Sequence, residues 1–152
     1  MIKIKPVPIK DIVNVFGQPN NQLNFVKRVF PFPLRLSYDK TAVAYNFYGH
    51  KYIADAVIEA FEDIREYYGL SFIKGYNLDI YGGCYADRMT VSGKRKSVHA
   101  WGLAIDYLPD MGAYNKPSTI PYHIVKAFTD RGFVWGGDWQ TKDGMHFSAI
   151  EE

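Results

Sequence analysis

Two histidines and two aspartates in the second half of the sequence are the side chains best suited to metal-dependent chemistry. His99 and Asp106 lie seven residues apart, and His146 follows further along the chain. Two imidazoles and one carboxylate suit a catalytic zinc ion, because three protein ligands leave a fourth position open for water. Asp143, three residues before His146, is the candidate general base that would pass a proton from water to a leaving amine.

An expected strand around Asp106 explains how these side chains could meet. Side chains alternate between the two faces of a strand, so the apolar residues within 103–107 would enter the core and Asp106 would face the other way. His99 lies an odd number of residues before Asp106, so a straight strand would separate them. A break at Gly102 would let them converge, and His146 would join them from an adjacent strand.

Each of these residues also has an ordinary structural explanation. A histidine in an apolar stretch is more often a hydrogen-bonded core residue than a ligand. Asp106 could pair with a nearby arginine, and Asp143-Gly144 is a common hairpin-turn dipeptide. The spacing alone therefore leaves a metal site and ordinary structure both open.

Two motifs in this half of the chain resemble the zinc-binding signature of the LAS-type peptidases. They read Ser97-x-His99-x-x-Gly102-x-Ala104-x-Asp106 and Asp143-x-x-His146-Phe147. The group includes D-alanyl-D-alanine carboxypeptidases and phage endolysins that cut L-alanyl-D-glutamate bonds, and hedgehog proteins share its fold. The stretch Trp135-Gly136-Gly137-Asp138-Trp139 resembles the endolysin and carboxypeptidase-like branch. The resemblance extends over residues 81–147.

The resemblance implies a role for each matching residue. It makes His99, Asp106 and His146 the ligands of Zn²⁺, the implied cofactor, and Asp143 the general base. Many relatives have glutamate at the base position, and the aspartate here matches the endolysin-like branch. Gly144 stands where that branch often has a bulkier residue, which predicts a less constrained loop around Asp143.

Arg88 is a further catalytic and substrate-binding candidate. It lies in a stretch that resembles the segment where relatives carry an arginine ahead of the signature. A guanidinium there would bind a substrate carboxylate or stabilise a developing oxyanion. The alternative is a surface ion pair with Asp87 or Asp110.

Ser97, Trp139 and Asp138 complete the predicted site. Ser97 would hydrogen-bond the local turn or a substrate carbonyl; a nucleophilic serine is the rival hypothesis, but no nucleophile-elbow pattern surrounds it. Trp139 would line the substrate groove or the core. Asp138 would orient a metal ligand by contacting it without binding the metal itself, or it would belong to a turn. Cys84 is the single cysteine, which excludes an internal disulfide and a thiolate metal site.

Helices and a small sheet must position these residues. Apolar residues recur at helical spacing from Lys51 to Tyr68, and Gly69 follows as a stop. A second helix is expected over 120–131, capped by Ser118 or Thr119. Strand-like stretches cover 77–81, 103–108, 133–135 and 145–149. These elements predict an α+β fold, a small mainly antiparallel sheet flanked by helices, which the resemblance makes hedgehog/DD-peptidase-like.

The first 48 residues differ in composition from the rest. They are rich in proline, asparagine and aromatic residues, with apolar runs such as 30–34. Prolines at this frequency exclude long helices and predict an extended, wrapping segment. We therefore expect a single zinc peptidase domain over residues 1–152, with a wrapping segment over 1–48 and a catalytic core over 49–152.

Composition limits the partners of the protein. With 152 residues, 47% hydrophobic and 22% charged, it is typical of an ordinary globular protein. A net charge of +2 is too mild to indicate nucleic-acid binding. The basic run Lys94–Lys96 is typical of a solvated loop, or could attract an anionic polymer. No stretch has the apolar length of a secretory signal or a membrane span, so we expect synthesis in the cytoplasm and no membrane insertion.

These observations predict a zinc metallopeptidase that cleaves the peptidoglycan stem peptide. The leading hypothesis is an endolysin-type L-alanyl-D-glutamate endopeptidase, acting as a monomer on the cell wall after release through a pore made by another protein. One alternative is a D-alanyl-D-alanine carboxypeptidase, in which Arg88 would bind the terminal carboxylate. Another is a non-catalytic, zinc-containing phage structural or binding domain, although the presence of Asp143 counts against it.

Overall fold

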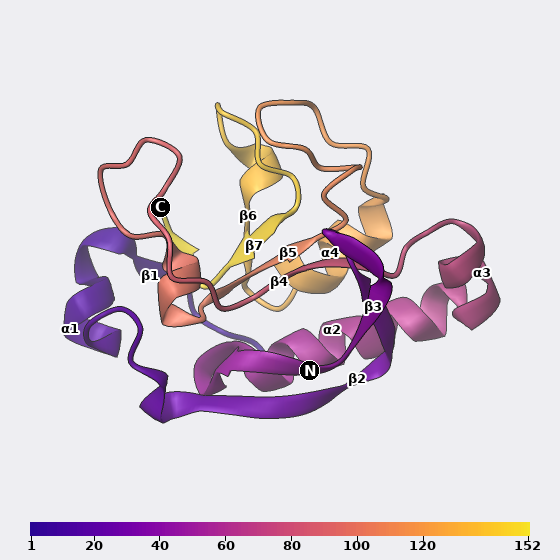
Figure 1. The fold of residues 1–152 in the computed structure, drawn as a ribbon, viewed down its shortest axis with the longest axis horizontal. Helices are drawn as coiled ribbons and strands as arrows, with labels where there is room; N and C mark the ends of the chain where they lie inside the picture. Colours follow the sequence, from indigo (N-terminus) through magenta and orange to yellow (C-terminus); the bar gives the residue numbers. More distant parts are fainter.

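Six strands form one sheet through the centre of the protein, whose residues 1–152 are described by a computed structural model (Figure 1). The strands are β2 (Phe25–Leu36), β3 (Asp39–His50), β4 (Ile80–Gly83), β5 (Ala104–Tyr107), β6 (Val134–Trp135) and β7 (His146–Ser148). Their order is β3-β2-β4-β5-β7-β6, and only β2 and β4 are parallel neighbours. The mainly antiparallel sheet confirms the predicted α+β class and is consistent with a hedgehog/DD-peptidase-like fold.

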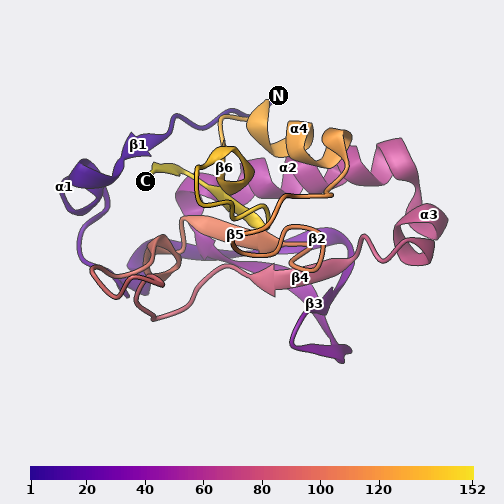
Figure 2. The same cartoon turned by 90° about the horizontal axis from the view of Figure 1, so that it is seen from above.

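The helices α2 (Lys51–Tyr68) and α4 (Tyr122–Thr129) lie together along one side of the sheet (Figure 2). The helix α2 has the predicted bounds, because Nδ1 of His50 accepts the Tyr52 N–H at its start and Gly69, with φ +79°, ends it. The helix α4 is shorter than expected at both ends, and Pro121 is its N-cap. Two short helices complete the set, α1 (Ile12–Phe16) and α3 (Leu70–Gly75). None of the helices combines the length and apolar character needed to cross a membrane.

The hydrophobic core lies between these two helices and the sheet. Tyr107 of β5 packs edge-on against Phe61 of α2, with ring centroids 5.0 Å apart, and Phe147 of β7 packs 4.6 Å from Phe128 of α4. Because side chains alternate along a strand, Asp106 and His146, the neighbours of these aromatic residues, face the opposite side of the sheet. The helices therefore cover one face and leave the other to the polar residues.

Three of the four predicted strand stretches contain a strand of the sheet: β5 lies within 103–108, β6 within 133–135 and β7 within 145–149. The stretch 77–81 is displaced, because β4 begins only at Ile80. Asn77 has φ +56°, a left-handed conformation that is incompatible with a strand and typical of a turn.

The N-terminal part contributes the two longest strands of the sheet, β2 and β3, which pair as an antiparallel hairpin. Residue 48 lies inside β3, and buried residues of the hairpin, such as Phe32 and Phe47, belong to the same core as the later elements. The prolines Pro31 and Pro33 lie between the paired residues Val29 and Leu34, where the ladder is irregular and no N–H is required.

Ahead of the hairpin, β1 (Val7–Pro8) pairs in parallel with β8 (Ile150–Glu151) as a separate two-stranded sheet. Both views show the C-terminal end of the chain beside β1 (Figures 1 and 2). The segment that follows β7 is therefore held by the first residues of the chain.

Candidate metal centre

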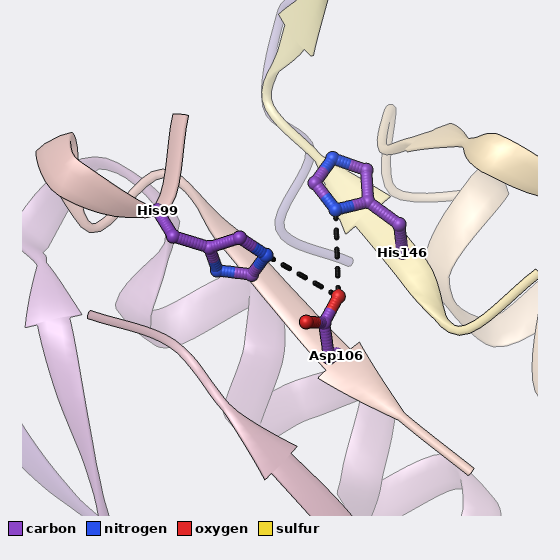
Figure 3. Close-up of side chains that lie close together, drawn as sticks. All are labelled: His99, Asp106 and His146. Atoms are coloured by element: carbon purple, nitrogen blue, oxygen red, sulfur yellow. Dashed lines mark ion pairs between the residues drawn. The ribbon is translucent and has the colours of Figure 1, made fainter. Parts of the chain in front are cut away.

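His99, Asp106 and His146 converge on the face of the sheet that the helices leave free. One ligand atom of each lies within 4.8 Å of the others. Oδ1 of Asp106 is 3.2 Å from Nε2 of His99 and 3.4 Å from Nδ1 of His146 (Figure 3). The structure therefore brings together the three residues that the sequence predicts as metal ligands.

The three residues come from two strands and a short helix rather than from two strands alone. Asp106 and His146 are direct partners on the neighbouring strands β5 and β7. His99 lies in the 3₁₀ helix η3 (Val98–Trp101), so the expectation that the three side chains meet from two adjacent strands is wrong. A single turn of 3₁₀ helix directs its imidazole back towards Asp106.

Gly102 makes this change of direction possible, as the sequence predicts. It ends η3 in the left-handed conformation, with φ +65°. A Cβ at this position would lie 2.7 Å from the ring of Phe25 and 2.9 Å from the backbone nitrogen of His50. Both the conformation and the lack of space therefore require glycine.

In each histidine, one ring nitrogen faces away from the cluster and forms a hydrogen bond. That bond identifies the other nitrogen as the one directed into the cluster. Nδ1 of His99 lies 2.6 Å from the carbonyl oxygen of Cys84, which only accepts, so Nδ1 carries the proton. Nε2 of His99 is then a bare lone pair, and it is buried without a hydrogen-bond partner. Nε2 of His146 lies 2.7 Å from a carboxylate oxygen of Glu152, which leaves its Nδ1 facing Asp106.

These lone pairs face a carboxylate oxygen, an arrangement that is favourable only with a positive charge among them. Two nitrogens and one oxygen at this spacing match the ligand types of a catalytic zinc site. Other divalent transition metals use the same ligands. The residues present therefore fit the metal that the sequence implies.

In the metal-free protein, a proton on His146 supplies the positive charge. Burial lowers the pKa of His146, but its contacts with Asp106 and Glu152 outweigh this effect and raise the pKa to about 10. Burial likewise raises the pKa of Asp106, yet the two histidines hold it well below its usual range. A metal ion would take over the role of this proton.

Asp143 lies at the edge of the same site, at the start of the turn into β7. Its carbonyl accepts the His146 N–H at 3.1 Å, and its own N–H donates to Gly136 at 2.9 Å. It is thus both a turn residue and a groove residue, because it lines a groove of about 210 Å³ together with His146 and Trp139. Burial raises the pKa of its carboxyl, which suits a proton acceptor.

The loop around Asp143 is tightly packed, contrary to the expectation drawn from Gly144. A Cβ at Gly144 would lie 2.8 Å from the Cβ of Ser118 and 3.0 Å from the Cα of Gly112. The missing side chain therefore lets the loop approach the segment before α4 closely. Glycine here constrains the loop by contact rather than loosening it.

Arg88 lies beside the cluster and does not form the surface ion pairs proposed as its alternative. Its Nη2 is 3.8 Å from Oδ2 of Asp106, and its side chain is 48% exposed. Asp87 and Asp110 pair with lysines instead. Arg88 thus presents a half-exposed guanidinium to the groove.

The remaining predicted residues are placed differently from one another. The Ser97 hydroxyl accepts the His99 N–H at 3.2 Å, which is the local-turn role considered for it. The indole of Trp139 lies 5.4 Å from the His146 ring.

Asp138 is exposed at the end of η4 (Gly136–Asp138) and has no hydrogen bond to any of the three candidate ligands. The carboxylate that does contact a ligand is Glu152, which no motif in the sequence marked.

A larger hollow of about 500 Å³ lies between α2 and α4, away from this chemistry. Its charged residues pair with one another, as Arg131 does with Asp63 and Lys126 with Asp130. We therefore place the candidate functional site at the smaller groove, where the candidate ligand His146 and the candidate base Asp143 meet.

Residues 90–149 match the sequence model of a family described as D-alanyl-D-alanine carboxypeptidase. The match confirms the resemblance to the LAS-type zinc peptidases over the segment that carries all three candidate ligands and Asp143. It supports a zinc-dependent metallopeptidase that acts on peptidoglycan. No curated protein and no solved structure matches the chain.

Proposed function

We propose that this protein is a zinc-dependent endopeptidase that cuts the peptidoglycan stem peptide between L-alanine and D-glutamate. The observation that supports the proposal is the position of Asp143, which lines the same groove as His146, one member of the His99, Asp106 and His146 cluster. A bare metal-binding fold would not need a partly buried acid with a raised pKa at this point.

Three residues of the groove have a task in this reaction. Zinc in the cluster would activate a water molecule and polarise the scissile carbonyl. Asp143 would accept the proton of the attacking water at a carboxylate oxygen and transfer it to the leaving amine. Arg88 would stabilise the negative charge on the carbonyl oxygen. Trp139 would form a wall for the stem peptide.

The choice of bond rests on the base. Asp143, an aspartate rather than a glutamate, matches the endolysin-like branch. We therefore propose that this protein cuts the same bond as that branch, the one between L-alanine and D-glutamate. The second candidate is a D-alanyl-D-alanine carboxypeptidase, which the description of the matched family favours. That reaction requires a cation for the terminal carboxylate of the substrate, and Arg88 is the candidate in the groove.

A digest of purified peptidoglycan by the zinc-loaded protein, analysed by mass spectrometry, tests the proposal. We expect a new N-terminal D-glutamate, which disappears with a chelator. Release of free D-alanine would instead establish the carboxypeptidase. A protein that binds zinc and yields no product from several wall types would be the non-catalytic domain.

Substitution of the base separates catalysis from metal binding. We expect Asp143→Ala to keep zinc and lose at least about a hundredfold in turnover. Asp138→Ala is the matched control, because Asp138 is a nearby exposed aspartate without a hydrogen bond to any of the candidate ligands. Full activity of zinc-loaded Asp143→Ala would refute the assigned mechanism.

A further inference from the structure

We propose that Glu152 is a positioning residue of the metal centre: its carboxylate holds His146 so that Nδ1 is the nitrogen offered to the metal. The inference rests on the metal centre that the proposed function also uses. Glu152 lies outside the matched segment 90–149, so its role is read from the contacts of this chain alone.

The contact between Glu152 and His146 is short and shielded from solvent. Oε2 of Glu152 lies 2.7 Å from Nε2 of His146. The Glu152 side chain is only 11% exposed and that of His146 only 6%, although the backbone of Glu152 is open to solvent. A charge-assisted hydrogen bond in such a place is stronger than one at the surface.

The chemistry of the two groups defines the orientation of the ring. An ionised carboxylate only accepts, so Nε2 of His146 must donate its proton to Glu152. In the neutral ring that a metal requires, Nδ1 then offers its lone pair, and this nitrogen faces Oδ1 of Asp106 at 3.4 Å. Figure 3 shows one ring nitrogen of His146 directed at Asp106 and the other on the far side of the ring. Without Glu152, the imidazole would be free to turn and to exchange its two nitrogens.

Glu152 is itself held from two sides. Nη2 of Arg95 lies 3.0 Å from its other oxygen, Oε1. The chain leading to it is tied down, because Val7 donates to Ala149 at 2.9 Å and Ile150 is fully buried. Residues of the N-terminal segment and of the basic loop thus cooperate to place one carboxylate against one metal ligand.

Zinc affinity, measured by competition with a chromophoric chelator, tests this role. We expect Glu152→Ala to bind zinc about 10- to 100-fold more weakly, the usual loss when a carboxylate behind a metal-bound histidine is removed. Glu152→Gln should restore most of the affinity, because its amide oxygen still accepts from Nε2. Glu151→Ala is the matched control, since Glu151 is an exposed neighbour on β8. Wild-type affinity of Glu152→Ala would overturn the proposal.

The state of the ring provides a readout that a purely structural role would not change. In the zinc-loaded protein, ¹⁵N–¹H correlation spectra should show a proton on Nε2 of His146 that exchanges slowly with solvent. Glu152→Ala should lose this signal, and Glu152→Gln should keep it. An unaltered signal in Glu152→Ala would refute the assignment. If Glu152→Ala failed to fold, Glu152→Leu, which keeps the bulk without an acceptor, would serve in its place.

These measurements require no peptidase activity. Zinc binding that depends on Glu152 in a protein that cuts no peptide would refute the proposed function and leave this inference intact. If the protein cleaved the peptide and Glu152→Ala bound zinc as tightly as the wild type, the inference on Glu152 would be refuted and the proposed function would stand.

Discussion

The two histidines of the candidate metal centre are held in different ways. His99 is oriented by a backbone carbonyl, that of Cys84, and lies in a helical turn that Gly102 ends. His146 lies on a strand and is oriented by a side chain, that of Glu152. Both rings meet the same oxygen of Asp106 at similar distances.

This difference shows which changes each ligand tolerates. A backbone carbonyl remains when any side chain is replaced, so His99 depends on the path of the chain. A carboxylate disappears with one substitution, so His146 depends on the identity of residue 152. We therefore expect backbone changes to act through His99 and side-chain changes to act through His146.

The largest effect should come from Gly102→Ala, which disturbs the backbone near His99. A left-handed φ and the contacts of the new Cβ with Phe25 and His50 should lower the free energy of unfolding by about 3 kcal/mol. Urea unfolding of the metal-free protein measures this loss. Gly93→Ala is the control, because Gly93 has φ +71° but nothing within 4 Å, and it should cost about 1 kcal/mol. Equal losses in both variants would show that crowding at Gly102 is unimportant.

Zinc binding should depend on pH through His146. Its pKa is raised to about 10, so the metal-free protein carries a proton there at neutral pH that zinc must displace. The affinity should therefore rise about tenfold per pH unit, or 1.4 kcal/mol, between about pH 7 and 9. The contacts of protonated His146 stabilise the folded, metal-free protein. The free energy of unfolding should therefore fall as pH rises towards the raised pKa of about 10, where His146 loses this proton. Calorimetry in buffers of different ionisation enthalpy counts the released protons, and an affinity independent of pH would contradict the assignment.

A smaller effect is expected from Ser97→Ala, which removes the hydroxyl that accepts the His99 N–H. The loss of this cap should cost about 1 kcal/mol in unfolding free energy and leave turnover by the zinc-loaded enzyme near the wild-type value. Thermal unfolding and the peptidoglycan digest measure the two quantities. A folded variant without turnover would revive the nucleophilic serine.

The smallest effect on the metal should come from Cys84→Ala. The contact with His99 uses the backbone oxygen of Cys84, so zinc affinity should match that of the wild type even though the lost thiol costs about 1 kcal/mol of stability. In the same competition assay, Glu152→Ala should weaken zinc binding and Cys84→Ala should not. The comparison tests whether His146 depends on a side chain while His99 depends on a backbone carbonyl. A large loss of zinc affinity would show that His99 also depends on a side chain.

Local patterns predicted much of the fold. The helical spacing of residues 51–68 and the stop at Gly69 predicted α2 with its observed bounds. Strand alternation placed Asp106 on the face opposite the core, and the break at Gly102 was expected from its residue type. The hairpin of β2 and β3 was missed, because Pro31 and Pro33 indicated an extended segment without showing that it pairs with the next one.

The sequence by itself determined the types of the candidate ligands, their order and the segment that matches the family model, because these depend on residue identity and short-range spacing. The tertiary structure alone decided that Glu152, and not Asp138, lies behind His146. That choice depends on the pairing of β1 with β8, which directs the last residues back over the site. Contacts between distant segments depend on how strands pair in three dimensions, and no local periodicity encodes this pairing.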